Sequence, residues 1–574
     1  MKRILCLLLC LLMLISLIAC NRQPANDSID TTAADTESAN DSIDTTAADT
    51  ESANDSIDTT VPDIEQPPVQ EGTDPCPVAE ITDGVFYMFE GETRLLNFSV
   101  YTPEDANGEV NWSSSSNCVT VDNGTVYAKK EGYSVVSGGG NSVCVVRVLP
   151  KTLPVLNLDV GGASITSKET YVDCRVSLNS SNSDYCFKNA TAGIRLRGNS
   201  TSKKPKKPYR IKFDSKRNML GMNDGAKCKS WVLLAEWFDA SMLHNSTSLS
   251  LASAILTEYT SDWRYVNVYI DDVYQGVYLL AEQSQINEHR VDIEEAGADT
   301  KDIRSGYLFE QENGSEDPFL TIDVQSYQYT NFLGEQYVPH VQLFHYELKN
   351  DDTTPEQEEF AKRYFKNVFD AIYMATYEGR YMAINEKGEL VPSNAKTAEE
   401  AIRALIDVDS LARKYIHSEL TCNWDDRQKS YYTHVDFSEG GTGLFTFSCP
   451  WDFDHAFYRW SKYTYADTEE YFAVRRNVWY VMLLNHQFIR ERIAEVWKEV
   501  YAGTNGFDST LDMMLQITRN YESDLRIDAD MWNRGSDRPA EVSDRITEAA
   551  KGYQWLIKRI TWLNEQFSDP DFVK

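Results

Sequence analysis

The chain has 574 residues, of which 12% are aromatic, and it carries a formal net charge of −33 at pH 7. Such an acidic protein repels nucleic acid, and the sequence holds no nucleic-acid-binding motif, so we expect no nucleic acid and instead proteins as partners. The composition is typical of a folded bulk without an internal transmembrane segment. It also offers no Cys-x-x-Cys motif or His cluster that would indicate zinc.

The first twenty residues predict export. Lys2 and Arg3 precede a long apolar run that ends in Ala19 and Cys20. The run is too short for an ordinary spanning helix, and a cysteine after a small residue is where a bacterial lipoprotein receives its lipid, so Cys20 is the predicted lipidation site. This interpretation anchors the protein to the outer face of a bacterial membrane. The alternative is a plain secretory peptide cut near Ala19, and both interpretations export the protein.

Residues 21–75 form an acidic repeat. Near-perfect copies of NDSIDTTAADTESA begin at Asn26, Asn40 and Asn54, and the segment contains no aromatic residue. It cannot bury enough apolar surface to fold, which predicts a self-repelling disordered tether.

Residues 76–150 contain short β-type runs separated by turns rich in Gly, Asn and Ser, a pattern that predicts a small all-β sandwich. The strings VNWSSSS and VTVDNGTVYAKKEG resemble the bacterial immunoglobulin-like group 2 domain, which implies a spacer or adhesive module. In an exported protein, Cys118 with Cys144 and Cys174 with Cys186 are candidate disulfides, although spacing alone does not determine the pairing.

The stretch from Asn423 to Asp454 carries the strongest chemical signal. Its loop, NWDDRQKS, follows a predicted helix over Val408–Leu420, whose apolar residues recur at helical spacing and for which Asp409 and Ser410 are predicted N-caps. Two predicted strands joined by a Gly-rich turn come next, and PWDFD follows them. Protein kinases have the same order of parts: a catalytic Asp, a Mg²⁺ ligand five residues later, a hairpin and an Asp-Phe-Gly metal site.

That order assigns roles to four residues. The candidates are the catalytic base Asp425 and the metal ligands Ser430, Asp452 and Asp454. Mg²⁺ bound by one or two carboxylates neutralises triphosphate and keeps coordination positions for phosphate oxygens. An isolated Asp-x-Asp more often caps a helix or makes a turn, so it is the order of the parts that favours metal binding.

Three further strings occur upstream in order: GIRLRGNSTSKKPKKPYRIKF, KSWVLLAEWFDASMLHN and VNVYIDDVYQGVYLLAEQ. Together with NWDD and PWDFD they closely resemble the spore-coat-protein-H (CotH) kinase-like family, from about Leu153 to the C-terminus. The resemblance implies an atypical protein kinase that uses ATP and Mg²⁺ to phosphorylate Ser or Thr residues of other proteins. It also implies an α+β fold, with a two-lobed kinase-like domain over residues 151–574 after the immunoglobulin-like sandwich.

Basic residues supply the candidate nucleotide contacts. The string YRIKF alternates like a strand and places Lys212 where kinases carry their phosphate-binding lysine. Arg195 and Arg197 share one face of the preceding strand, where their guanidinium forks suit either phosphate or a buried carboxylate, and Arg197 is taken as a nucleotide contact. Glu282 lies where a kinase hinge meets adenine, with a structural role as the alternative. The lysine cluster over 203–207 attracts phosphate or an acidic substrate, or is a solvated loop.

Helices dominate the second half of the sequence. A helix expected over Ser241–Leu256 has no Glu in its first turns to pair with Lys212, so this part of the kinase template fails. The later predicted helices are Glu356–Tyr373, Trp479–Tyr501, Leu511–Leu525 and Ala540–Phe567. The strand-rich part up to about Glu310 is the predicted other lobe.

One position departs from the family pattern. Ser430 stands where family members usually place Asn, so an oxygen ligand changes rather than disappears, because a hydroxyl can also coordinate Mg²⁺. The leading hypothesis is a lipid-anchored extracytoplasmic protein kinase acting on surface or secreted proteins. The alternative is a non-catalytic surface-binding or adhesion lipoprotein that keeps the fold as a scaffold.

Overall fold

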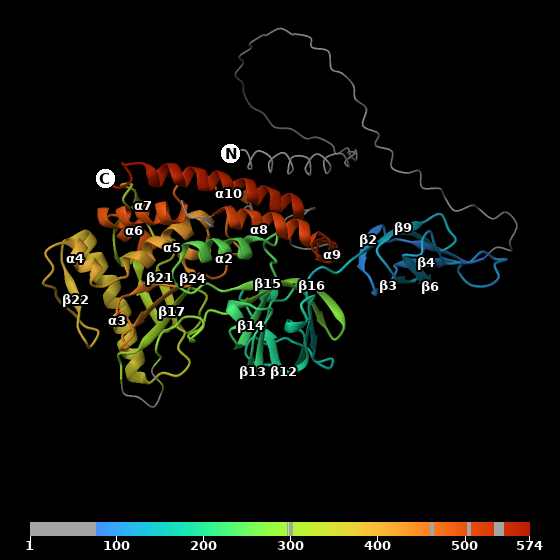
Figure 1. Ribbon diagram of the computed structural model, residues 1–574, viewed down its shortest axis with the longest axis horizontal. Helices are drawn as coiled ribbons and strands as arrows, with labels where there is room; N and C mark the ends of the chain where they lie inside the picture. The colour runs from blue at the N-terminus through green and yellow to red at the C-terminus, as the bar shows by residue number, and fades with distance from the viewer. Residues whose placement is uncertain (1–75, 296, 298–301, 460–463, 502–506, 533–544) are drawn as a thin grey trace, which may run out of the picture.

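The computed structural model describes residues 76–574 apart from 296, 298–301, 460–463, 502–506 and 533–544 (Figure 1). The predicted signal segment, the lipidation site Cys20 and the acidic repeat lie outside the described residues.

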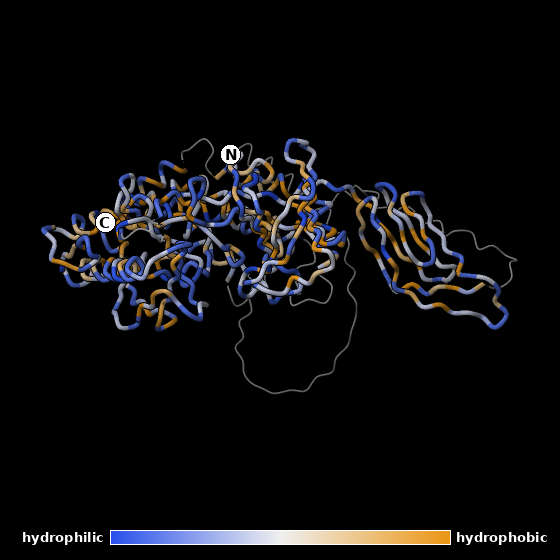
Figure 2. The backbone as a smooth tube through the Cα atoms, turned by 90° about the horizontal axis from the view of Figure 1, so that it is seen from below, coloured by the Kyte–Doolittle hydropathy of each residue, from blue (hydrophilic) through white to orange (hydrophobic). Residues whose placement is uncertain are grey.

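The N-terminal part of the described chain is built from strands only. They are β1 (Val78–Ile81), β2 (Val85–Phe89), β3 (Thr93–Leu95), β4 (Phe98–Tyr101), β5 (Ser113–Ser114), β6 (Val119–Asp122), β7 (Thr125–Ala128), β8 (Gly132–Ser137) and β9 (Val143–Leu149). A four-stranded sheet, β2-β9-β8-β5, and a three-stranded sheet, β3-β7-β6, enclose one apolar core. The core is formed by every second residue of their strands, the residues that point inward. Figure 2 shows this region projecting from one end of the molecule.

The next seven long strands close into a barrel. They are β10 (Val155–Asp159), β11 (Val172–Asn179), β12 (Phe187–Leu196), β13 (Tyr209–Arg217), β14 (Cys228–Leu234), β15 (Trp263–Ile270) and β16 (Val273–Glu282). The order around the barrel is β10-β11-β12-β13-β14-β16-β15, and β10 closes it by pairing in parallel with β15. Alternate residues such as Ile194, Ile211 and Trp231 are fully buried inside it, so the residues between them face outward.

A second sheet lies beside the barrel, in the order β18-β21-β17-β24-β25. Its strands are β17 (Gly306–Glu312), β18 (Leu320–Asp323), β21 (Leu343–Leu348), β24 (Lys429–Asp436) and β25 (Thr446–Phe447). The predicted hairpin is present, because Thr433 pairs with Phe447 and His434 with Thr446. However, β17 belongs to this sheet rather than to the barrel, so the strand-rich part up to Glu310 is not one unit as expected.

Helices cover this sheet and run along one side of the molecule (Figure 1). They are α2 (His244–Ile255), α3 (Pro355–Tyr373), α4 (Ala398–Arg403), α5 (Val408–Thr421), α6 (Val478–Leu483), α7 (Gln487–Tyr501), α8 (Phe507–Asn520), α9 (Glu522–Trp532) and α10 (Arg545–Ser568). Two-stranded pairings complete the elements: β19 (Tyr329–Thr330) with β20 (Gln336–Tyr337), β22 (Met382–Ile384) with β23 (Leu390–Pro392), and β26 (Tyr458–Arg459) with β27 (Thr464–Tyr465).

Two predicted helices are divided in the structure. The single helix expected over Trp479–Tyr501 breaks between α6 and α7, where Asn485 donates side-chain hydrogen bonds to the carbonyls of Val481 at 2.8 Å and Thr330 at 2.9 Å. The helix expected over Leu511–Leu525 spans the end of α8 and the start of α9. At the break between α6 and α7, these side-chain bonds to the backbone compete with helix continuation.

The expected disulfides are absent from the described residues. Cys118, Cys144 and Cys174 are buried free thiols, and Cys186 is an exposed free thiol. Across the described ranges, no helix combines the length and the apolarity that crossing a membrane requires.

Candidate active site

Acidic and basic side chains from the barrel and from the second sheet with its loops line one narrow pocket of about 90 Å³. Five of the predicted site residues are among them: Arg197, Asp425, Ser430, Asp452 and Asp454. They come from the end of β12, the loop after α5, the start of β24 and the loop after β25. The sequence therefore identified residues that lie more than 200 positions apart and meet at one place.

Helix α5 delivers Asp425 to the pocket. Its N-cap is Asp407, which accepts hydrogen bonds from the backbone amides of Asp409 at 2.9 Å and Ser410 at 3.1 Å, so the predicted caps were wrong by two or three residues. At its other end, the side-chain amide of Asn423 donates to Asp426 Oδ1 at 3.1 Å and to the Asp452 carbonyl at 3.0 Å. Asn423 thus ties the NWDD loop to the PWDFD loop.

Ser430 occupies a β-bulge. Gln311 of β17 pairs with Tyr431 and Glu312 pairs with Lys429, which leaves Ser430 as the extra residue of β24 with a φ of 51°. A bulge re-aims the side chain of its extra residue, and here it turns Ser430 towards the pocket that Asp425 also lines.

Left-handed backbone conformations gather around the pocket. Besides Ser430, Asp452 has a φ of 61° and Glu236 has a φ of 51°. Each such conformation costs a non-glycine residue on the order of 1–3 kcal/mol and is found preferentially at active sites. The local strain is a property expected of a functional site rather than of a structural loop.

The carboxylates of the pocket repel one another. Burial and then the charge of Asp452 raise the pKa of Asp425 to about 7, and the same two causes raise the pKa of Asp454 to about 8. Nearby positive charge would reverse this effect, because it favours the ionised form of a carboxyl group. An acid cluster of this kind suits a divalent cation.

The donor set is suitable for Mg²⁺ but does not form a complete cage by itself. In the described part of the chain, no group of three or more His, Cys, Asp or Glu side chains is placed to hold a metal ion. Mg²⁺ commonly uses one or two protein carboxylates and takes its remaining oxygens from phosphate and water. Asp452 and Asp454 with the Ser430 hydroxyl fit that requirement.

Asn245 and Glu236 belong to the site but were missed at the sequence level. The side-chain amide of Asn245, in the first turn of α2, donates to Asp454 Oδ1 at 2.7 Å and to the two Glu236 oxygens at 3.1 and 3.2 Å. Its Oδ1 accepts the backbone N–H of Phe453 at 2.9 Å. Helix α2, which lacks the expected Glu, therefore uses the Asn245 amide to orient the PWDFD loop of residues 450–454, called the acid loop below. No local sequence pattern marks an Asn for that role.

Two cations balance part of this negative charge. Arg197 lies over the Trp451 ring, 5.4 Å from its centre. Burial and the charge of Asp452 raise the pKa of Asp425, and the positive charge of Lys429 partly opposes this rise. Lys429 lines the pocket beside Ser430, its neighbour in the chain, and was not predicted. Glu310 of β17 also lines the pocket and forms an ion pair with Lys349 at 2.9 Å.

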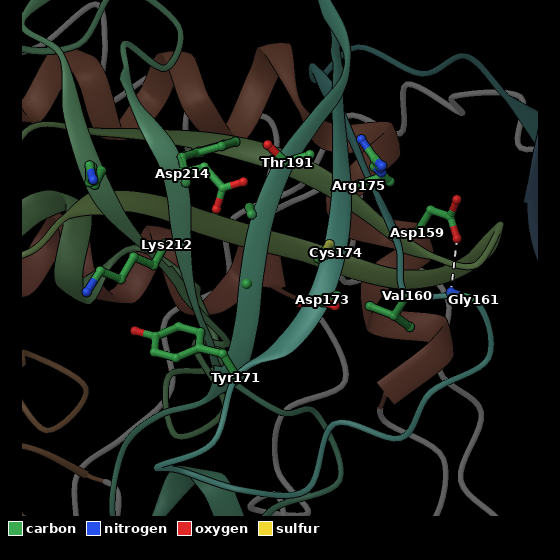
Figure 3. A pocket seen from close by; sticks show the side chains of 14 residues that line it. Asp159, Val160, Gly161, Tyr171, Asp173, Cys174, Arg175, Thr191, Lys212 and Asp214 are labelled. Carbon is green, nitrogen blue, oxygen red and sulfur yellow. Dashed lines mark hydrogen bonds between the residues drawn. The ribbon is translucent and has the colours of Figure 1, made fainter.

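Two predicted nucleotide contacts do not line this pocket. Lys212 projects from the outer face of β13 into a separate groove of about 800 Å³ (Figure 3), because the strand turns its alternate residues Ile211 and Phe213 into the barrel core. Glu282 is buried, with Oε1 at 3.3 Å from Arg290 Nε and 3.2 Å from the Asn223 side-chain nitrogen. These contacts agree with a structural role for Glu282, which was the alternative to an adenine contact.

Comparison with known proteins adds one finding. A protein-family model described as CotH kinase protein matches residues 194–521, which include all five predicted residues of the pocket. A search of curated proteins finds no match to the chain.

Proposed function

The chain belongs to the CotH kinase family, and on that basis we propose that it is a protein kinase that transfers phosphate from ATP to Ser or Thr residues of surface or secreted proteins. The observation that carries the proposal is the meeting of Arg197, Asp425, Ser430, Asp452 and Asp454 at one pocket. The order of Asp425, Ser430, Asp452 and Asp454 along the chain is that of the catalytic base and metal ligands of protein kinases.

Each residue has a role that follows from its chemistry. Asp425 accepts the proton of the acceptor hydroxyl, or aligns that hydroxyl for attack. Asp452, Asp454 and Ser430 would hold Mg²⁺, which when bound neutralises phosphate charge. Arg197 and Lys429 supply positive charge at the same pocket, where it stabilises phosphate oxygens.

We propose that the enzyme works outside the cytoplasm, held to the membrane by lipid on Cys20. The support is the sequence of residues 1–20, followed by an acidic repeat suited to a tether. Metabolic labelling with palmitate tests this location: label is expected on the parent protein and not on a Cys20→Ala variant. Equal labelling of both proteins would refute the anchor.

Phosphate transfer is tested with the purified full-length chain, γ-labelled ATP, Mg²⁺ and a Ser-rich acceptor protein. Asp425→Asn and Asp452→Asn are each expected to lower transfer at least about 100-fold, which is the usual contribution of a general base or of a metal ligand. Asp184→Asn removes one exposed carboxylate from the connection between β11 and β12, outside both cavities, and serves as the matched control. Unchanged transfer by either site variant would refute the assigned role.

A non-catalytic binding scaffold is the second candidate. The pocket volume of about 90 Å³ favours it, because it is below the roughly 300–1,000 Å³ typical of small-molecule sites. The family resemblance also implies Asn at position 430, where this chain has Ser. Absence of both phosphate transfer and Mg²⁺-dependent nucleotide binding would decide for the scaffold.

A further inference from the structure

Two arginines face each other on adjacent strands of the barrel. Arg195 of β12 is the direct partner of Arg210 of β13 in the antiparallel register. Side chains in such a pair start about 5 Å apart, and like charges directly opposite each other are destabilising. Both arginines are partly buried, which increases that cost.

Within the described residues, neither guanidinium group forms an ion pair with a carboxylate, and the charge of Asp351 acts on Arg210 only from beyond ion-pair distance. The Nε atoms of Arg195 and Arg210 are both buried without a hydrogen-bond partner, and Arg210 has one side-chain bond, from Nη2 to the Ser230 hydroxyl at 3.2 Å. Burial lowers the pKa of Arg210, and the charges of Arg195 and Arg197 lower it further, whereas Tyr171 and Asp351 act in the opposite direction. The sequence left phosphate and a buried carboxylate open as partners of Arg195, and no carboxylate of the described ranges forms an ion pair with it.

Arg195 is nevertheless held in place. Its guanidinium lies 5.0 Å from the centre of the Tyr171 ring, and Tyr171 packs directly on Gly193. A Cβ atom at Gly193 would lie 2.9 Å from Tyr171 Cβ, so a larger residue would displace the ring. Arg195 is therefore positioned before any ligand arrives, which reduces the entropic cost of binding.

The pair also lies between two cavities. Arg197 lines the acidic pocket, and Gly193, on the same outward face of β12, lines the groove shown in Figure 3; Arg195 is the residue between them on that face. The acidic pocket has about 90 Å³ and the groove about 800 Å³. A ligand whose end enters the acidic pocket has room for the rest of its length only beyond that pocket.

We propose that Arg195 and Arg210 form a binding site for a polyphosphate chain and that this chain is the phosphate tail of the nucleotide. Guanidinium forks bind phosphate oxygens in pairs, and a polyanion removes the repulsion between the two arginines. The nucleotide as the source of the phosphate rests on the proposed function, whereas the binding of polyphosphate does not.

Thermal unfolding of the full chain with Mg²⁺, in the presence of tripolyphosphate, ATP or adenosine, tests the site. Tripolyphosphate and ATP are expected to raise the melting temperature of the parent, and adenosine is not. The double variant Arg195→Gln with Arg210→Gln should bind both phosphates at least about 10-fold more weakly, because it loses charge-assisted hydrogen bonds. Lys188→Gln, which removes one exposed positive charge from β12 of the same barrel and lies outside both cavities, is the control.

The stability of the unliganded protein separates binding from a structural role. Without ligand, the double variant is expected to be at least as stable as the parent, because the substitution removes the repulsion; a structural pair would instead lose stability. Undiminished stabilisation by tripolyphosphate in the double variant would overturn the site. If ATP stabilises the parent and the double variant equally, the phosphate tail of the nucleotide is not the polyphosphate chain that the arginines bind. Polyphosphate binding without phosphate transfer would contradict the kinase proposal and leave the site intact.

Discussion

Substitution of Asn245 by Ala is expected to disturb the acid loop from the helix side. Asn245 is 1% exposed, and it makes three donor contacts to Glu236 and Asp454 and one acceptor contact to the amide of Phe453. Ala removes all of them and leaves two buried carboxyl groups and one amide without these partners. Such a buried group costs about 1–3 kcal/mol when its partner is lost.

The three groups together predict a loss of unfolding free energy of about 3 kcal/mol or more. A folded unit of roughly 420 residues has an unfolding entropy of about 0.9 kcal/mol/K, so this loss corresponds to a melting-temperature decrease of roughly 3–4 °C. Scanning calorimetry measures the shift directly. Phosphate transfer, measured at a temperature where the variant is folded, should fall about 10–100-fold, as when a group that orients a metal ligand is removed.

Asn520→Ala, at an exposed position at the end of α8, is the matched control and should change neither quantity. Asn245→Asp keeps the size but replaces the donor with a further acid beside Glu236 and Asp454. It should be less stable than Asn245→Ala, and Mg²⁺ should recover part of the difference. A parent-like melting temperature and transfer rate in Asn245→Ala would refute the view that this amide holds the acid loop.

Three further substitutions test other parts of the fold. Glu419→Ala leaves Arg559 buried without its partner at 2.7 Å, both side chains being 0% exposed, and should cost about 3–5 kcal/mol in denaturant unfolding, whereas an exposed ion pair would cost little. Burial lowers the pKa of His417 to about 3, so the unfolded state binds a proton below pH 6.5 and the folded state does not. The unfolding free energy should therefore fall with pH below 6.5, by about 2 kcal/mol at pH 5, and His417→Asn should show a shallower fall; parallel curves would contradict this. Thr354→Ala removes the capping box that Thr354 forms with Gln357 at the start of α3 and should cost about 1 kcal/mol, while Thr354→Ser should restore most of it.

Local periodicity predicted most elements of the kinase-like domain. The helix expected over Val408–Leu420 is α5, and the strand expected at YRIKF begins β13. Both patterns depend on burial of one face, which the sequence displays directly. The break between α6 and α7 depends on Asn485 bonding to Thr330, a residue more than 150 positions away, so no window of sequence could show it.

The candidate site was predictable where order along the chain reflects chemistry. Asp425 and Asp454 follow a pattern of parts that kinases share, and the structure brings both to one pocket. Lys212 was assigned from the same template, but its place in the barrel depends on how the strands close and not on its own strand. Asn245 and Lys429 were missed because their roles exist only after α2 and β24 have packed against the acid loop.

Substitutions of Ser430 distinguish the effect of its strained backbone on stability from a role of its hydroxyl in binding Mg²⁺. Its φ of 51° is unfavourable for Ser, tolerated by Asn and free for Gly. Ser430→Gly should relieve on the order of 1–3 kcal/mol of strain, partly offset by the roughly 0.5–1 kcal/mol of extra chain entropy of Gly in the unfolded state, and should be as stable as the parent or more stable. If the hydroxyl is a metal ligand, the same variant should need at least about 10-fold more Mg²⁺ for phosphate transfer, and Ser430→Asn should need no more than the parent. Magnesium titrations of transfer decide the matter, because equal requirements in all three proteins would show that Ser430 shapes the loop without touching the metal.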